Sequence, residues 1–144
     1  MQLSDEKPDP STLLEMGRSV LAEQPLSVWI GTQVNSFTEG AIELEVAVRE
    51  DLTQQHGFVH GGVISYLADN AITMAGASML GDSVTGEYKV NYLRPAVGDR
   101  LVARAQVARA GKRQAVAQCE IFAVSDGEEK LCAVALGTAN KIAP

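Results

Sequence analysis

Apolar and polar residues alternate along much of the chain with the two-residue period of a β-strand that buries one face. Turn residues such as Glu39-Gly40 separate the alternating stretches. Within one stretch, the alternation puts Val84 and Tyr88 on one face of the strand and Thr85 on the other. We predict strands at residues 28–37, 42–48, 84–92, 101–107, 115–121 and 131–138.

Two stretches have helical spacing instead. A first helix is indicated by apolar residues at intervals of three and four after Thr12, which has capping-box spacing with Glu15, and Gln24-Pro25 ends it. A second and longer helix is predicted over residues 63–79, which are apolar and rich in small residues, directly after Gly61-Gly62.

The order of these elements predicts an α+β fold in a single domain. Hairpin-length turns between strands imply an antiparallel sheet, and the chain offers one long helix to cover a face of it. Residues 1–10 are polar and contain two prolines, so we expect a flexible tail there and one domain over residues 11–144.

Composition and charge narrow the functional classes. The net charge of −6 and the pI near 4.8 argue against a nucleic-acid partner, which needs Lys and Arg to neutralise phosphates. The chain has no uncharged apolar run near the roughly 20 residues that span a bilayer, and its N-terminus is acidic, so we expect a cytoplasmic protein with no membrane partner. Cys119 and Cys132 lie in apolar runs without a CxxC spacing and are expected to be core thiols in a reducing compartment.

A basic segment stands out against the acidic chain. Seven of the 12 Lys and Arg residues fall between Lys89 and Arg113, where Asp99 is the only acid. These cations fit either solvated strand faces or a local anion site for a phosphorylated small molecule.

The long helix carries the candidate chemistry. Polar residues gather on one of its faces, and Asp69 is the only charged residue from Val63 to Leu80. The helix is too apolar to stand free, which places this carboxylate at an interface. Gly61-Gly62 leaves backbone N–H groups uncovered at the positive end of the helix dipole, which is where an oxyanion would bind. The polar face consists of Ser65, Tyr66, Asp69, Asn70 and Thr73.

Four motifs, in this order along the chain, resemble one known family. The runs His60-Gly61-Gly62-Val63, Leu67-Ala68-Asp69-Asn70, Asn91-Tyr92-Leu93-Arg94-Pro95 and Ala135-Leu136-Gly137-Thr138 are similar to the hotdog-fold acyl-CoA thioesterases of the phenylacetyl-CoA (PaaI-type) group. The resemblance covers roughly residues 27 to 140. It implies a hotdog fold, in which an antiparallel sheet wraps around one long central helix.

The resemblance also implies site residues. The catalytic carboxylate of the family matches Asp69, and the backbone amide that polarises the thioester carbonyl matches Gly61. Several relatives have an Asn six residues before the HGG histidine, which orients the water or the thioester carbonyl. This chain has Gln54 there, which keeps the amide on a longer side chain. The Ser or Thr that assists in some members is matched most nearly by Thr85.

Spacing adds an expectation about assembly. Gly61 and Asp69 are eight residues apart on one helix, roughly 12 Å at 1.5 Å per residue, so one helix cannot bring both to the same thioester carbon. We therefore expect a homodimer with two composite sites. The family implies that two such dimers often pair into a tetramer.

The expected reaction is hydrolysis of a small, medium or aromatic acyl-CoA to the free acid and CoA. Asp69 acts as general base on water or attacks the carbonyl to form an anhydride, and both routes stay open. No metal or separate cofactor is expected, since coenzyme A is part of the substrate, and no metal-ligand spacing occurs. The expected phosphate ligands are Arg94, Lys112 and Arg113.

Two other functions fit the same fold. A hotdog hydratase or dehydratase acting on hydroxyacyl thioesters would need His60 as its base, and His56 is a second histidine nearby. An acyl-CoA-binding protein without turnover is the other alternative. Release of free thiol from a panel of acyl-CoAs by the wild type and by Asp69→Asn separates all three.

Overall fold

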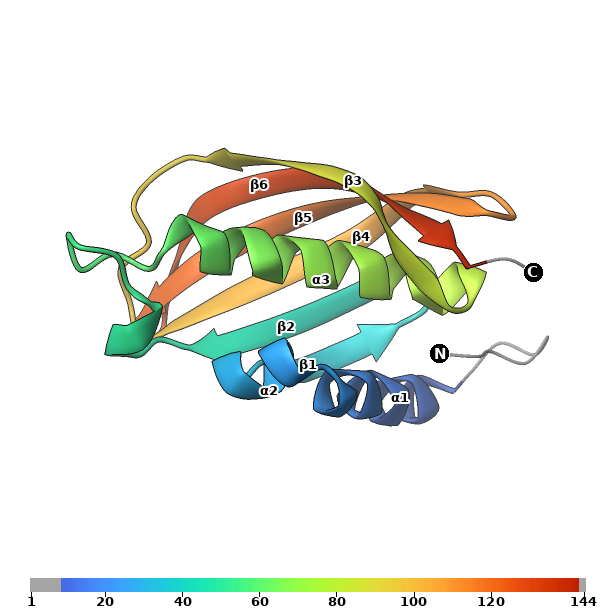
Figure 1. Cartoon of the computed structure of the whole chain (residues 1–144), viewed down its shortest axis with the longest axis horizontal. Coiled ribbons are helices and arrows are strands. Elements are labelled where there is room, and N and C mark those ends of the chain that lie inside the picture. Colours follow the sequence, from blue (N-terminus) through green and yellow to red (C-terminus); the bar gives the residue numbers. More distant parts are fainter. Residues whose placement is uncertain (1–8, 143–144) are drawn as a thin grey trace.

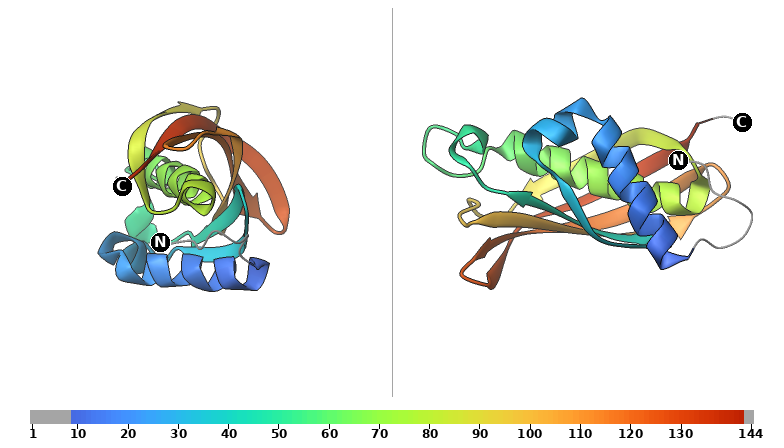
Figure 2. Two further views of the ribbon diagram at one scale, coloured as in Figure 1. Left: turned by 90° about the vertical axis from the view of Figure 1, so that its right-hand side faces the viewer. Right: turned by 90° about the horizontal axis from the view of Figure 1, so that it is seen from below.

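The structure is a computed structural model that describes residues 9–142, and its strands curl around one helix (Figure 1). Six antiparallel strands form one sheet in the order β1-β2-β4-β5-β6-β3, with α3 against its concave face (Figure 2). The elements are α1 (Pro10–Glu23), α2 (Pro25–Ile30), β1 (Gln33–Thr38), β2 (Ala41–Ala47), η1 (Glu50–Leu52), α3 (Gly61–Leu80), β3 (Ser83–Tyr92), β4 (Arg100–Ala110), β5 (Gln114–Ser125) and β6 (Glu128–Lys141). The predicted hotdog arrangement is confirmed.

The helix α3 is enclosed by the sheet because apolar residues cover more than one of its faces. Leu67, Ala71 and Ile72 are fully buried against the sheet, and most of the helix beyond Asn70 has buried side chains. Inward-facing residues of β2, β4, β5 and β6 complete the core around it. Burial of this kind contributes roughly 25 cal/mol per Å² of apolar surface and is the main force that holds the sheet around α3.

The hairpins follow the predicted turns. Glu39-Gly40 joins β1 to β2, and β5 and β6 meet at a two-residue turn in which Asp126 and Gly127 have φ values of 50° and 78°. Two positive φ angles in sequence match the right-handed twist of the flanking strands. Cys119 and Cys132 are both buried free thiols, as expected for core residues.

The start of the chain differs from the prediction in two respects. Asp9, and not Thr12, caps α1, because the Asp9 carboxylate accepts a hydrogen bond from the Ser11 amide. The strand predicted over residues 28–37 begins later, at Gln33, because residues 25–30 form the short helix α2, in which Pro25 at the first position favours a helical conformation and which Gly31 ends with φ of 86°. Of the expected tail, residues 1–8 lie outside the described residues, and Pro10 belongs to α1.

A polar cluster ties the α1–α2 junction to the middle of α3. The Tyr66 hydroxyl lies 2.5 Å from Ser27 Oγ and 2.8 Å from Thr32 Oγ1. Asn70 Nδ2 donates to Gln24 Oε1 at 3.0 Å and to Tyr66 Oη at 3.2 Å. Tyr66 and Asn70, which the sequence placed on the chemical face of the helix, therefore hold α2 in position.

The strand β3 contains a bulge that corrects the predicted alternation. Thr85 pairs with Ala139 and Glu87 with Thr138, which leaves Gly86 as an extra residue. A Cβ on Gly86 would lie 2.6 Å from Asn140 Nδ2, so any other residue here would force the Asn140 side chain to move. Because the bulge shifts the alternation by one residue, Thr85 and Tyr88 both face α3, whereas Val84 is exposed.

Candidate active site

The first turn of α3 presents one free backbone donor. Gly62 N donates to His60 Nδ1 at 2.8 Å, and Val63 N donates to the His60 carbonyl at 2.9 Å. Within the part of the chain that the structure describes, the Gly61 N–H has no acceptor. This amide lies at the positive end of a 20-residue helix, so it can donate to a developing oxyanion.

His60 is the N-cap of α3. Its Nδ1 accepts a hydrogen bond, so the neutral imidazole carries its proton on Nε2 and has no free basic nitrogen. A Cβ on Gly62 would lie 2.9 Å from this Nδ1, which explains why glycine follows. His56 is exposed in the preceding turn, with its ring centre 6.4 Å from that of Phe58.

Tyr92 covers the start of α3 from β3. Its hydroxyl donates to the Gly61 carbonyl at 2.8 Å, and a Cβ on Gly61 would contact the phenol at 3.4 Å. Tyr92 was not among the predicted site residues, although it belongs to the Asn91-Tyr92-Leu93-Arg94-Pro95 motif. Its contact with Gly61 bridges residues 31 positions apart, which no sequence spacing reveals.

Asp69 lies eight residues after Gly61 on α3, where it is half-buried beside β3. Thr85 Oγ1 donates to Asp69 Oδ1 at 2.5 Å, Thr73 Oγ1 donates to the same oxygen at 3.4 Å, and the two hydroxyls lie 2.9 Å apart. Among residues 9–142, Asp69 Oδ2 has no hydrogen-bond partner. The threonines thus orient the carboxylate and leave one oxygen for chemistry.

Gln54 does not point its amide at either group. Its side-chain oxygen accepts a hydrogen bond from His56 N at 2.5 Å, and its backbone bonds with Phe58 and Gly57 close the turn that precedes α3. Gln54 therefore shapes the loop leading to His60 and Gly61 in this structure.

The predicted residues form separate groups in one chain. Gly61 and His60 lie at the start of α3, and Asp69 with Thr85 lies about two turns along it, as the spacing implied. Arg94 follows β3 at the end near Gly61, whereas Lys112 and Arg113 occupy the β4–β5 turn. The 11 residues of β4 put about 33 Å between these two ends.

Residues 9–142 contain neither a membrane-spanning helix nor a metal-ligand cluster. No helix between residues 9 and 142 is long and apolar enough to cross a bilayer. In the same range, no three His, Cys, Asp or Glu side chains gather closely enough to ligate a metal ion.

Known proteins match both the sequence and this geometry. The model of the thioesterase superfamily matches residues 56–130, which is more than half of the chain. The acyl-coenzyme A thioesterase PaaI of Escherichia coli is 31% identical over 114 residues, covering 78% of this chain and 79% of the relative.

Solved structures agree. A thioesterase family protein from Silicibacter pomeroyi superposes with a TM-score of 0.85 and 34% identity over 89% of this chain and 96% of its own. The Escherichia coli PaaI protein from the phenylacetic acid degradation operon superposes with a TM-score of 0.83 and 27% identity. The superposition covers 94% of this chain and 97% of the PaaI chain. The predicted family is confirmed, and the chain belongs to the thioesterase superfamily as a hotdog-fold thioester hydrolase of the PaaI type.

Proposed function

We propose that this protein hydrolyses acyl-CoA thioesters to a free carboxylic acid and CoA. The observation that carries the proposal is that, among residues 9–142, neither the Gly61 N–H at the start of α3 nor Asp69 Oδ2 on the same helix has a hydrogen-bond partner. One group suits the carbonyl oxygen of a thioester, and the other suits a water molecule or the carbonyl carbon.

The reaction follows from these two groups. The Gly61 N–H, aided by the helix dipole, stabilises the negative charge that develops on the thioester oxygen. Asp69 Oδ2 removes a proton from water as it attacks, or it attacks the carbonyl itself to form an anhydride that water then cleaves. Collapse of the intermediate expels the CoA thiolate. Thr85 holds Asp69 for either route.

We propose that each site is shared between two copies of the chain. Gly61 and Asp69 are roughly 12 Å apart along α3, too far to act on one carbon atom. β3 is an edge strand of the sheet, and its outer backbone groups are open to a second strand. Antiparallel pairing of two β3 strands would set the two α3 helices side by side, with Gly61 of each facing Asp69 of the other. Two such dimers would form a tetramer.

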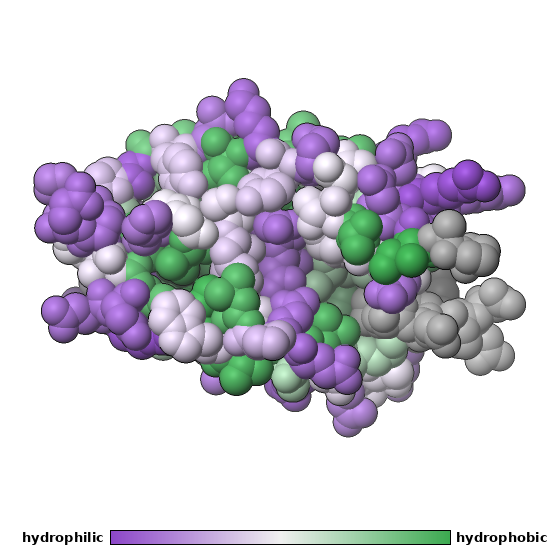
Figure 3. Space-filling view, in the orientation of Figure 1, coloured by the Kyte–Doolittle hydropathy of each residue, from purple (hydrophilic) through white to green (hydrophobic). Residues whose placement is uncertain are grey.

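The surface beside α3 supports the proposal that a second copy of the chain binds there. Figure 3 shows the face of the molecule on which α3 is open, with apolar side chains gathered over α2. Leu26, Val28 and Trp29 of α2 are all more than half exposed. Contiguous apolar side chains of this size are typical of a protein interface.

The alternatives fit the geometry less well. A hydratase needs His60 as base, but its Nδ1 is engaged as the cap of α3. An acyl-CoA-binding protein needs no free carboxylate oxygen, and Asp69 has one.

For the substrate, the Escherichia coli relative named for phenylacetic acid degradation favours aromatic acyl groups, and small and medium acyl groups remain in the proposal. We expect no metal or separate cofactor, and a cytoplasmic location.

Thiol release tests the function. Purified protein and Asp69→Asn are assayed with phenylacetyl-CoA, benzoyl-CoA and straight-chain acyl-CoAs, with a chromogenic disulfide to detect free CoA. Turnover by the wild type with a loss of at least about 100-fold in kcat for Asp69→Asn supports the proposal. Equal thiol release by both proteins contradicts the assignment of Asp69, and release from no substrate favours the binding protein.

A further inference from the structure

The 3 tyrosines of the chain hold their hydroxyl groups in different surroundings. The Tyr66 hydroxyl lies within 2.8 Å of two side-chain hydroxyls, and the Tyr88 hydroxyl lies 2.7 Å from Ser65 Oγ on α3. Both of these tyrosine side chains are half-buried. Tyr92, by contrast, is 54% exposed, and its hydroxyl donates to a backbone carbonyl, that of Gly61, at 2.8 Å. The first two tyrosines fasten α3 to its neighbours, whereas Tyr92 is accessible to a ligand.

The Gly61 carbonyl does not depend on the hydrogen bond from Tyr92. Gly61 is the first residue of α3, and in an α-helix a carbonyl accepts from the N–H four positions later, here that of Ser65. A hydrogen bond at an exposed position contributes little net stability, because water can replace either partner. The Tyr92 hydroxyl can therefore leave this carbonyl for a stronger acceptor. An oxyanion is such an acceptor, since hydrogen bonds to a charged group are roughly twice as strong as neutral ones.

The Tyr92 hydroxyl also lies on the side of Gly61 to which the Gly61 N–H points. A Cα–Cβ bond in an α-helix tilts toward the N-terminus, and the first N–H groups point the same way. A Cβ on Gly61 would lie 3.4 Å from Tyr92 Oη, and a Cβ is about 2.5 Å from its own nitrogen, so Oη lies within about 6 Å of Gly61 N. Two donors that share one acceptor at about 2.8 Å each are up to about 5.6 Å apart. A small rotation of the phenol therefore lets both groups donate to one oxygen atom.

The backbone at the start of α3 offers a single donor within the described residues. Gly62 N and Val63 N are both bound to His60, which leaves the Gly61 N–H. The side-chain oxygen of Gln54 is bound to a backbone N–H in the preceding turn. A developing oxyanion is stabilised by several donors fixed in advance around it, and tyrosine hydroxyls serve as such donors. A second donor at this site therefore has to come from a side chain.

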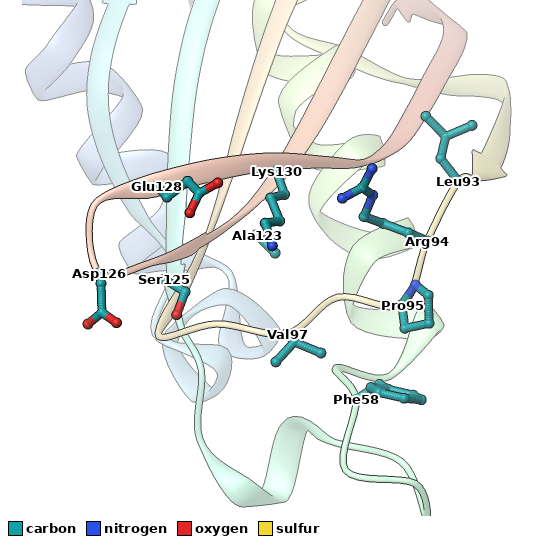
Figure 4. A pocket seen from close by; sticks show the side chains of 10 residues that line it. All are labelled: Phe58, Leu93, Arg94, Pro95, Val97, Ala123, Ser125, Asp126, Glu128 and Lys130. Carbon is teal, nitrogen blue, oxygen red and sulfur yellow. The ribbon is translucent and has the colours of Figure 1, made fainter.

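Open space for a ligand adjoins the segments that carry both groups. Leu93 and Arg94, which directly follow Tyr92, line a groove of about 660 Å³ (Figure 4). Phe58, three residues before Gly61, lines the same groove. The volume is within the range of roughly 300 to 1,000 Å³ that small-molecule sites occupy. A substrate can thus approach the start of α3 from the side on which Tyr92 lies.

We propose that Tyr92 is a second oxyanion donor. Its hydroxyl moves from the Gly61 carbonyl to the carbonyl oxygen of the bound thioester, and the new hydrogen bond strengthens as negative charge develops on that oxygen. The inference rests on the proposed hydrolysis of acyl thioesters and adds a catalytic residue to it. The phenol keeps its proton throughout, so one hydrogen-bond acceptor is exchanged for another. In the shared site, both donors belong to one copy of the chain and Asp69 belongs to the other.

Tyr92→Phe tests the inference, because it removes the hydroxyl and keeps the ring. We expect kcat for the best acyl-CoA substrate to fall at least about tenfold while KM changes less than about threefold, since the hydrogen bond is strongest in the transition state. Tyr88→Phe is the matched control. It removes the same atom from the same strand, and it should change kcat less than about threefold, because its partner is another side-chain hydroxyl.

Denaturant unfolding shows that both variants are folded. Equal kcat for the wild type and Tyr92→Phe, equal losses in the two variants, or a rise in KM without a fall in kcat would overturn the inference. Thiol release that is lost in Asp69→Asn but unchanged in Tyr92→Phe would leave the proposed function standing and overturn only the role of Tyr92.

A spectroscopic measurement needs no turnover and separates the inference from the proposed function. An acyl-CoA labelled with ¹³C at the thioester carbonyl is bound to Asp69→Asn with and without Tyr92→Phe, and its carbonyl stretching band is recorded by isotope-edited infrared spectroscopy. A hydrogen bond to the oxygen lowers the stretching frequency, so the band should move to higher frequency with Tyr92→Phe. That shift supports the inference even where no thioester is hydrolysed. A band at the same frequency in both proteins, or no bound thioester in either, would overturn it.

Discussion

Thr85 Oγ1 on β3 donates a hydrogen bond of 2.5 Å to Asp69 Oδ1 on α3, and this contact exists because Gly86 bulges out of the strand. Without the bulge, Thr85 would face away from the helix. The bond fixes one oxygen of the carboxylate, and the other has no hydrogen-bond partner among residues 9–142. The strand that is free to pair with a second copy therefore also orients the proposed catalytic acid of its own chain.

Thr85→Val should reduce kcat by about 10- to 100-fold. The substitution keeps the shape of the side chain and removes a hydrogen bond to a charged group, which is typically worth about 1.5 to 3 kcal/mol. Thr85→Ser should restore most of the rate because it keeps the hydroxyl. Steady-state kinetics on the best acyl-CoA substrate checks both, and a Val variant as active as the wild type would show that Thr73 alone suffices.

Gly61→Pro should remove the proposed oxyanion donor while α3 stays folded. Proline lacks the N–H and is favoured at the first position of a helix, and His60 already has the extended conformation, φ −59° and ψ 133°, that a residue before proline requires. We expect kcat to fall by about 10²- to 10³-fold. Gly61→Ala, which keeps the N–H and brings its Cβ to 3.4 Å from Tyr92, is the control and should retain most activity.

Mixing Asp69→Asn with Gly61→Pro tests whether the site is shared. If the donor and the acid come from different copies, each mixed dimer regains one intact site, and random exchange of subunits should restore about a quarter of wild-type activity. Neither variant alone recovers. Activity that stays at the level of the separate variants after subunit exchange, followed by native mass spectrometry, would place both groups of each site in one chain.

His60→Ala should lower the free energy of unfolding by about 1 kcal/mol while kcat changes less than about threefold. The expected cause is loss of the N-cap that the imidazole supplies to Gly62 N. His60→Asn should recover the stability, because asparagine is among the best N-cap residues. Denaturant unfolding and thiol release are measured on the same samples. A loss of turnover with unchanged stability would instead make His60 a base, as a hydratase requires.

Cys119 should be inert to thiol reagents in the folded protein. Burial raises the pKa of its thiol from the ordinary value of 9.0 to about 12, and burial also raises the pKa of Cys132. At pH 8 we expect the 2 cysteines to react with a chromogenic disulfide only after unfolding, so they do not disturb the thiol-release assay. The raised pKa stabilises the fold fully below about pH 9, and this contribution is lost as pH rises toward 12. A fast reaction of the native protein would contradict the burial.

The helix at residues 63–79 and the strands from residue 42 onward could be located from their periodicity, although in β3 the bulge leaves Val84 exposed and turns Thr85 toward α3. The helix at residues 25–30 could not, since Val28, Trp29 and Ile30 favour a strand by themselves, whereas in the fold Ser27 of this segment is hydrogen-bonded to Tyr66 and Asn70 of α3.

The family, the hotdog fold and the separation of Gly61 from Asp69 follow from the amino-acid sequence, because they depend on motifs and on the rise of one helix. Which side chains contact one another depends on the folded chain. The bulge at Gly86 brings Thr85 to Asp69, and Tyr92 reaches Gly61 across 31 residues. A bulge depends on how two strands pair, so the alternation along one strand contains no sign of it.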